Sequence, residues 1–389
     1  MNRFMNDVNE KASKRLNLIK RLASTTWGAS KGTLRQLYLG YVRSAMDYAL
    51  PIQEIATKQA KEPVDRIQNQ AVKLICGGTR TTPIAACEID SNIEPLDLRR
   101  KRSVLQGVER YRRFEDNHPN RRLVDTWVPN RRLKQESLLD AAKNLEEIHH
   151  LPDNRLLEEK FSDVAPWTNL KSAVIKTSLL DPSVNKSTDP NILKLNTLET
   201  IDTYSSSSIH AYTDGSAFKG TTFAGFGGHL KFPDNSKFEF NDACGTFCSN
   251  FEAEISAIKK AVEITHQSFE NNERLPSNLV IFTDSQSTLQ ALLEISPNSN
   301  PDIVSLAKTI DFLLTSYDVK ITLQWIPGHC GIQGNETADR LAELGTQKEH
   351  PEKKCSMPTT NQILNNNFKE QWLNRWSAGT TGRVMYNHM

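Results

Sequence analysis

Four carboxylates in the second half of the chain occupy positions that favour metal chemistry. Asp214 and Asp284 each follow an apolar segment typical of a strand, "SIHAYT" and "LVIFT". Glu254 and Asp339 lie in segments with a helical pattern, "AEISAI" and "ETADRLA". Carboxylates that directly follow strands face the carboxyl edge of an α/β sheet, where ligands bind. Because Mg²⁺ takes oxygen ligands, four such groups at one edge predict a pair of metal ions suited to phosphodiester hydrolysis.

Each carboxylate taken alone also has a structural explanation. A turn residue, a helix N-cap or an exposed helical charge would account for any single one of them. These explanations give no reason for four acids to fall into one order of strands and helices. We therefore interpret the four as one site.

Glu252 competes with Glu254 for the helical position. Helical residues two apart diverge by about 200° around the axis. Glu254 shares the face of Ile258, and we assign the site position to Glu254. Trp325, at the end of the last predicted strand, is expected to pack in the core.

Apolar patterns predict the elements that bring these residues together. Three strands with short turns precede a helix, and a fully apolar strand follows that is typical of burial on both faces. Two helices, a strand and a last helix complete the order βββαβααβα. This order predicts an α/β fold, a mixed five-stranded sheet with flanking helices. The ranges are 208–213, 221–232, 237–245, 251–266, 279–282, 285–295, 302–316 and 319–325, with the last helix opening near Asn335.

The chain is expected to divide into four segments. The first is a small, basic, all-helical module, in which apolar residues recur at helical spacing. The second is rich in Asn, Pro, Ser and charge and is interpreted as a linker that is partly helical. The third carries the four carboxylates, and the fourth is a tail without assignment. Their ranges are 1–114, 115–205, 206–346 and 347–389.

The overall composition says little about which ligands the chain binds. Lys and Arg total 48 against 46 for Asp and Glu, so the net charge of +2 indicates no particular ligand. The cations gather in the first segment, for example at 14–21 and 99–102, and a basic module beside an acidic site suits a phosphate backbone. Six cysteines without zinc-ribbon spacing disfavour structural zinc and disulfides.

Neither a signal-peptide pattern nor a run of about 20 apolar residues is present. The protein is expected to be soluble and intracellular, in the nucleus or the cytoplasm, without a membrane partner. No small-molecule cofactor is expected, and protein partners are not identified.

The motifs together resemble the type 1 ribonuclease H family. "YTDGS", "NFEAEISAI", "FTDSQS" and "WIPGHCGIQGNETADRLA" match its pattern in the same order. The resemblance implies that Asp214, Glu254, Asp284 and Asp339 hold two Mg²⁺ ions, with Mn²⁺ as a substitute. It also implies that His329, in "PGHCGIQG", is catalytic, since an imidazole moves protons near neutral pH.

The same resemblance implies the substrate and its contacts. The enzyme would be an endoribonuclease that hydrolyses the RNA strand of an RNA/DNA hybrid. Gly215 and Ser216 would contact phosphate, and Asn250 and Gln286 would contact minor-groove edges and sugars. An RNA strand is distinguished by its 2′-hydroxyl groups, so recognition should not depend on base sequence. Because the stretch 296–302 lacks the basic helix that bacterial-type enzymes often carry, hybrid binding is expected either to depend on the helical module or to remain weak in isolation.

A second resemblance covers about the first hundred residues. "KRLNLIKRLASTTWGASKGTLRQLYLGYVRSAMDY" and "DRIQNQAVKLICGGTRTTPIAAC" are similar to the segment downstream of the polymerase palm in non-LTR retrotransposon reverse transcriptases, which resembles a helical thumb. The double aspartate of the polymerase does not occur, so polymerase activity is not predicted. Two alternatives stay open: a catalytically ineffective nucleic-acid-binding remnant of a decayed retroelement, and an integrase-like nuclease of the same fold.

Overall fold

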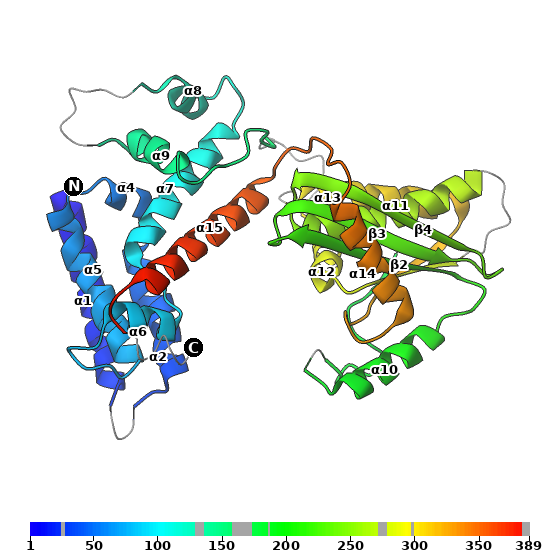
Figure 1. Ribbon diagram of the computed structural model, residues 1–389, viewed down its shortest axis with the longest axis horizontal. Coiled ribbons are helices and arrows are strands. Elements are labelled where there is room, and N and C mark those ends of the chain that lie inside the picture. The colour runs from blue at the N-terminus through cyan, green and yellow to red at the C-terminus, as the bar shows by residue number, and fades with distance from the viewer. Residues whose placement is uncertain are drawn as a thin grey trace. The chain divides into compact units, whose positions relative to one another are not determined.

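The chain folds as two compact units. The computed structural model describes residues 1–24, 28–128, 136–157, 173–185, 187–270, 278–296 and 299–382. One unit comprises residues 1–158 and 360–389, and the other comprises residues 159–359 (Figure 1). The division differs from the expected four segments, because most of the predicted tail belongs with the helical unit. Within the described ranges, no helix combines the length and the apolar composition that crossing a bilayer requires.

The first unit is helical, as expected for the beginning of the chain. Met5, Ala12 and Leu16 recur on one face of its first helix and pack against buried residues such as Tyr38 and Val64. A second core joins Leu98 and Leu105 to Leu364 and Phe368 of the last helix. The helices are α1 (Asn2–Leu22), α2 (Lys31–Leu37), η1 (Tyr38–Arg43), α3 (Ser44–Met46), α4 (Leu50–Glu54), α5 (Lys58–Ile75), α6 (Ile84–Ser91), α7 (Leu96–Arg112), α8 (Pro119–Thr126), α9 (Leu138–Glu146) and α15 (Met357–Ala378).

Parts of the predicted linker are ordered. Helices α8 and α9 belong to the first unit, and α10 (Pro190–Asp202) belongs to the second. Ser137 caps α9 through a reciprocal hydrogen-bonded pair with Asp140, which explains why the expected helix begins there. Residues 129–135 and 158–172 of the predicted linker lie outside the described residues.

The second unit is built on a mixed six-stranded sheet, in the order β1-β6-β5-β2-β3-β4. Strands β2, β5, β6 and β1 run parallel, while β3 and β4 are antiparallel to their neighbours. The strands are β1 (Val174–Lys176), β2 (Ile209–Phe218), β3 (Thr222–Lys231), β4 (Lys237–Phe247), β5 (Asn278–Thr283) and β6 (Lys320–Trp325). The predicted order βββαβααβα is confirmed between β2 and the last helix of the sheet.

The expected number of five strands is wrong by one. β1 adds an edge strand from the predicted linker, pairing Val174 with Thr322 of β6. Three residues in a polar segment carry too little pattern to predict a strand. The strand is held by its pairing with an existing sheet edge.

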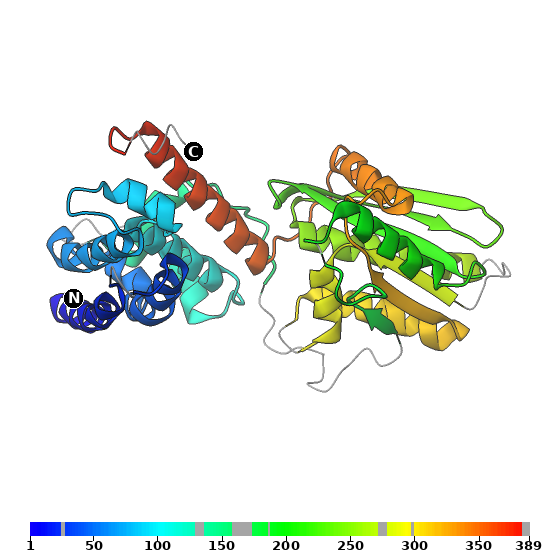
Figure 2. The same ribbon diagram turned by 90° about the horizontal axis from the view of Figure 1, so that it is seen from below.

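Helices cover both faces of the sheet. Leu279 and Ile281 of β5 point to a core shared with α11 (Asn250–Glu270), α12 (Gln286–Leu293) and α13 (Pro301–Tyr317). Val280 and Phe282 alternate with them and join a second core that includes Ala338 of α14 (Gln333–Thr346). Figures 1 and 2 show α14 on the face opposite α11 and α13. The continuous apolar run is therefore explained by burial on both faces.

The segment after α14 closes the second unit. Lys353 Nζ lies 2.9 Å from Asp302 Oδ2 at the start of α13. Thr359 donates its hydroxyl to Glu252 Oε2 at 2.9 Å, in the first turn of α11. These contacts attach residues of the predicted tail to the two helices beneath the sheet.

Glycines in β3 let α14 lie directly on the strand. A Cβ on Gly227 would stand 2.4 Å from the backbone nitrogen of Ala342, and one on Gly225 would stand 2.2 Å from that of Thr346. Backbone atoms of a packed helix cannot move aside as a flexible side chain does. The position of α14, and of Asp339 on it, therefore depends on these two glycines.

We expect Gly227→Ala to destabilise the second unit by about 1–3 kcal/mol, because the added methyl group overpacks a backbone contact. Gly107→Ala is the matched control, since a Cβ there meets nothing within 4 Å. The control should be stabilised by about 0.5–1 kcal/mol through lower backbone entropy of the unfolded chain. Urea unfolding followed by circular dichroism measures both, and equal behaviour of the two variants would contradict the argument.

Candidate active site

Asp214, within β2, and Asp284, directly after β5, occupy neighbouring positions. Strands β2 and β5 are parallel neighbours, and their register pairs Thr213 with Thr283. The residue after each of these threonines is one of the two aspartates. Asp214 is 7% exposed, and Asp284 is half-buried. The parallel pairing therefore places both carboxylates beside each other, where β5 ends. The apolar pattern predicts that the first strand ends before Asp214 as well, but β2 continues to Phe218 because it stays paired with β3.

Glu254 reaches the same place from α11. A Cβ on Gly215 would lie 2.4 Å from the backbone nitrogen of Glu254, so only glycine lets this helix approach β2 so closely. The side chain of Glu254 is 7% exposed. One carboxylate oxygen from each of Asp214, Glu254 and Asp284 lies within 4.8 Å of the others. Three of the four predicted carboxylates thus form one group.

Burial and mutual repulsion disfavour the ionised forms of these carboxyl groups. Burial, followed by the charges of Asp284 and Asp339, raises the pKa of Asp214 to about 8. Burial, followed by the charges of Asp214 and Asp284, raises the pKa of Glu254 well above its usual value. The backbone N–H of Gly215 opposes both shifts by hydrogen bonding. A divalent cation would remove the repulsion that causes them.

One buried carboxylate oxygen, without a hydrogen-bond partner in the described part of the chain, indicates that a hard cation fits this group of carboxylates. Glu254 Oε2 is buried and has no hydrogen-bond partner among the described residues. A buried polar atom without a partner costs free energy, and a bound ion satisfies it. Oxygen ligands from three carboxylates are the donor set that Mg²⁺ and Mn²⁺ prefer.

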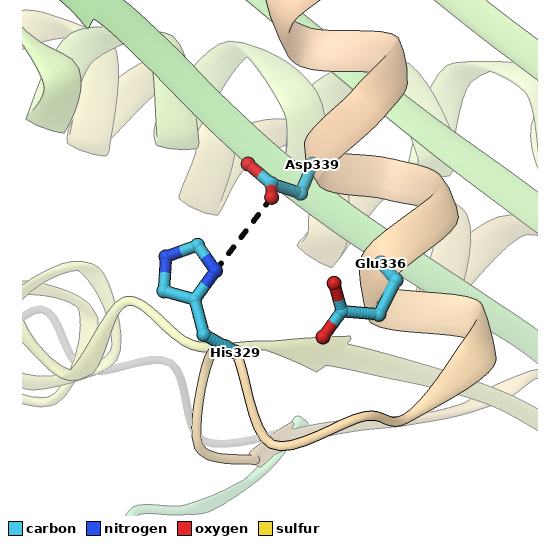
Figure 3. A group of neighbouring side chains, drawn as sticks. All are labelled: His329, Glu336 and Asp339. Carbon is cyan, nitrogen blue, oxygen red and sulfur yellow. Dashed lines mark ion pairs between the residues drawn. The ribbon is translucent and has the colours of Figure 1, made fainter.

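Asp339 links this group to a second one. Its side chain interacts with Asp214 and contributes to the raised pKa there. On the other side, Asp339 Oδ2 lies 3.6 Å from His329 Nδ1. His329, Glu336 and Asp339 each place one possible ligand atom within 4.8 Å of the others, and Figure 3 shows them facing one another. The side chain of His329 is 79% exposed and is therefore open to solvent.

The loop that carries His329 has a defined shape. His329 adopts a left-handed backbone with φ +53°, and Gly331 follows with φ +77°. The N–H of Gly331 donates to Glu336 Oε1 at 3.2 Å. A Cβ on Gly328 would stand 2.2 Å from Asp284 Oδ2, so the loop passes tightly over that carboxylate.

Sequence reasoning missed Glu336. It precedes Asp339 by three residues, a spacing that places both side chains on one helical face. That spacing was the available signal. Glu336 fixes the loop through Gly331 and adds a carboxylate beside His329.

Trp325 does more than fill space. It is 2% exposed, as expected for a core residue, and its indole Nε1 donates to the backbone carbonyl of Asp284 at 3.2 Å. Thr283 Oγ1 accepts from the N–H of Ser285 at 3.2 Å on the other side of the same turn. These hydrogen bonds help to hold the turn that carries Asp284.

Glu252 has a structural role, in keeping with the choice of Glu254. Its carboxylate accepts hydrogen bonds from the N–H of Ser249 at 2.9 Å and from Thr359 at 2.9 Å. Burial acts to raise the pKa of Glu252, but these hydrogen bonds and the charge of Lys353 lower it overall. Glu252 thus closes the first turn of α11 with its charge satisfied.

The predicted substrate-contact residues lie within four positions of a site carboxylate along the chain. Gly215 and Ser216 follow Asp214 in β2, and Ser216 is half-buried. Asn250 is the first residue of α11, and Gln286 is the first of α12. Both amides are exposed.

The raised pKa of Asp214 makes stability depend on pH in metal-free protein. An unfolded Asp titrates near 4, whereas the folded group titrates at about 8. The folded state binds more protons between these values, so the free energy of unfolding falls as pH rises through this window. In EDTA at pH 8, we expect the free energy of unfolding of Asp214→Asn to exceed that of the native protein by more than about 1.4 kcal/mol. This value is the free energy that corresponds to a shift of about one pKa unit.

With Mg²⁺ at pH 8, the native protein should become more stable than Asp214→Asn in urea unfolding. A cation that binds only the folded state stabilises the native protein, whereas the amide of Asp214→Asn is a poor ligand. Asp242→Asn, at an exposed strand position, is the matched control and should respond to Mg²⁺ as the native protein does. A native protein that is the more stable one in EDTA at pH 8 would contradict the electrostatic account.

Known proteins match the part of the chain that holds this site. The family model for RNase H matches residues 206–347. Ribonuclease H of Albidiferax ferrireducens is 27% identical over 150 residues, covering 36% of this chain and 94% of that protein. Ribonuclease H of Polaromonas naphthalenivorans is 27% identical over 148 residues, covering 35% of this chain and 86% of that protein.

Solved structures align over the same third of the chain. Ribonuclease H1 from the archaeon Halobacterium salinarum is 25% identical with a TM-score of 0.29, covering 36% of this chain and 98% of that one. LC11-RNase H1 in complex with an RNA/DNA hybrid is 16% identical with a TM-score of 0.29, covering 35% of this chain and 98% of that one. From the family match and the curated relatives, residues 206–347 of this chain form a ribonuclease H domain.

Proposed function

We propose that the chain is an endoribonuclease that hydrolyses the RNA strand of RNA/DNA hybrids with two divalent cations. The observation that carries the proposal is the group of three carboxylate oxygens within 4.8 Å of one another, two of them on buried side chains of raised pKa. Two relatives named ribonuclease H support the reaction class.

We assign the ions to Asp214, Glu254, Asp284 and Asp339. Mg²⁺, or Mn²⁺ in its place, would supply charge neutralisation at the scissile phosphate and an activated water. The chain itself keeps the four carboxylates in position. The N–H of Gly215 favours the ionised forms of Asp214 and Glu254, and Trp325 holds the turn of Asp284.

His329 is proposed to move a proton as the product leaves. Its exposed imidazole lies next to Asp339, which orients the ring through Nδ1 at 3.6 Å. Glu336 keeps the loop in place through the N–H of Gly331. An imidazole held in this position can act as a general acid or base.

Substrate recognition is proposed to follow the shape of the hybrid. Gly215 and Ser216 would donate to a phosphate, and the exposed amides of Asn250 and Gln286 would reach minor-groove edges and sugars. The 2′-hydroxyl groups of an RNA strand lie in the wide minor groove of the hybrid. Cleavage would therefore be independent of base sequence.

The origin of the chain is proposed to be a non-LTR retrotransposon. The support is the similarity of the first hundred residues to the segment that follows a polymerase palm, together with the helical fold of that region. In such an element the nuclease would remove template RNA after first-strand synthesis.

Two glutamates on one helix give the test of the activity. We expect Glu254→Gln to lower the rate of RNA cleavage in a labelled hybrid by more than about 100-fold, equivalent to more than about 2.7 kcal/mol of barrier. Glu252→Gln is the matched control, two residues away in α11. It should lose stability, because it weakens the cap at Ser249, but keep its turnover per folded molecule.

The outcomes separate the possible functions. Cleavage confined to the RNA strand and dependent on Mg²⁺ supports the proposal. Binding of the hybrid without cleavage by the native protein would identify a catalytically ineffective remnant. Cleavage of duplex DNA in preference to the hybrid would identify an integrase-like nuclease.

His329→Ala should lower kcat at least about tenfold, since a positioned acid or base contributes about 100-fold or more. KM should change little, because the ring does not bind the ground state of the substrate. His266→Ala, a half-buried histidine in α11, is the control and should keep its kcat. The measurement is steady-state cleavage of the hybrid between pH 6 and 9, and an unchanged kcat for His329→Ala would exclude this role.

A further inference from the structure

The densest positive charge of the sequence is largely neutralised within the helical unit. Arg99, Arg100 and Arg102 form the densest basic run of the sequence. Arg99 lies 2.5 Å from Asp47, and Arg102 lies 2.7 Å from Glu94. Arg100 is 2% exposed and makes two hydrogen bonds to a carboxylate, that of Asp65. This run therefore offers little free charge to a partner.

A different set of cations surrounds one hollow. The hollow has a volume of about 620 Å³ and lies between the ends of α1, α5 and α6. Lys20, Arg66, Lys73 and Arg80 line it, and its lining contains no Asp or Glu in the part of the chain that the structure describes. Gathering four like charges costs free energy unless a counter-charge is present. The hollow is thus prepared for an anionic ligand.

The partners of these cations are mainly neutral. Lys73 Nζ donates to the carbonyl oxygen of Arg80 at 2.6 Å, and Lys20 Nζ donates to Gln70 Oε1 at 2.9 Å. Among the described residues, the one ion pair of this set joins Arg66 to Glu62 at 3.5 Å, and both side chains are exposed. Exposed pairs of that kind are worth little.

The start of α6 adds to the positive potential. Ile84 is its first residue and lines the hollow. Pro83, at the N-cap position, provides no side-chain cap. The first N–H groups of a helix carry a partial positive charge and favour phosphate.

We propose that this hollow binds the phosphate backbone of a nucleic acid strand. The inference rests on the proposed function for the class of ligand, and on the four cations for the place. Asn69 and Gln70 provide neutral donors beside them, and Leu74 gives the hollow an apolar wall. Phosphates recur along a strand, so a strand satisfies several spaced cations at once, which a single carboxylate does not.

Binding of labelled nucleic acid by the full chain tests the proposal. Fluorescence anisotropy in EDTA, with a single-stranded RNA and an RNA/DNA hybrid as separate probes, measures affinity without cleavage. Lys20→Glu/Arg80→Glu reverses two exposed cations of the hollow. Lys11→Glu/Lys58→Glu is the matched control, with the same charge change at exposed positions outside the hollow on α1 and α5.

The hollow variant should bind at least about tenfold more weakly than the native protein, and its plot of log K against log salt should be shallower by about 1.4 to 1.8 for two lost phosphate contacts. The control should stay within about twofold. The two probes show whether a single strand or a duplex is preferred. Arg66→Glu, at an exposed position, provides a second variant and should weaken binding in the same direction.

Equal losses in the hollow variant and the control would overturn the proposal, as would no loss in either. Displacement of RNA by polyglutamate of matched charge would overturn it too, since any polyanion would then suffice. Anisotropy in EDTA does not depend on catalysis. If the chain does not cleave the hybrid, the binding test of the hollow is therefore unaffected. If the hollow does not bind nucleic acid, the cleavage test of the proposed function is unaffected.

Discussion

Repulsion among carboxylates is the constraint on which the nuclease unit depends. Asp214, Glu254 and Asp284 hold oxygens within 4.8 Å of one another, largely away from water. Such groups separate unless the backbone prevents it. Parallel pairing of β2 with β5 fixes two of them, and the approach of α11 over Gly215 fixes the third. The stability of the rest of the unit offsets the unfavourable free energy of this repulsion. The raised pKa values of Asp214 and Glu254 reflect the same repulsion, together with burial.

Much of the site follows from the sequence because apolar runs and motif residues adjoin. Asp214 and Asp284 could be predicted from apolar runs that stop one residue before them. The roles of Glu336 and Trp325 could not, since they act through backbone groups of a loop and a turn that sequence patterns do not describe. Strand β1 escaped prediction for a related reason, because its pairing partner and not its composition makes it a strand.

In the helical unit, the densest basic run of the sequence is not the surface that offers positive charge to a ligand. The run at Arg99–Arg102 dominates the sequence, yet Asp47, Asp65 and Glu94, all outside the helix that carries the run, compensate most of it. Lys20 belongs to a basic cluster of the sequence, whereas Arg80 lies 60 positions later and outside such a cluster. Folding brings both to one hollow. The packing of α1, α5 and α6 therefore forms a cationic surface that the sequence pattern does not predict.

The contacts of Lys353 and Thr359 have a practical meaning for the limits of the nuclease. Similarity to the family ends at 347, but the carboxylates of Asp302 and Glu252 find their partners up to twelve positions later. The border of homology is therefore not the border of cooperative folding. A shortened gene that ends at 347 would remove Lys353 from Asp302 and Thr359 from Glu252, which would keep its hydrogen bond from the N–H of Ser249. One that ends after Thr359 would retain both contacts.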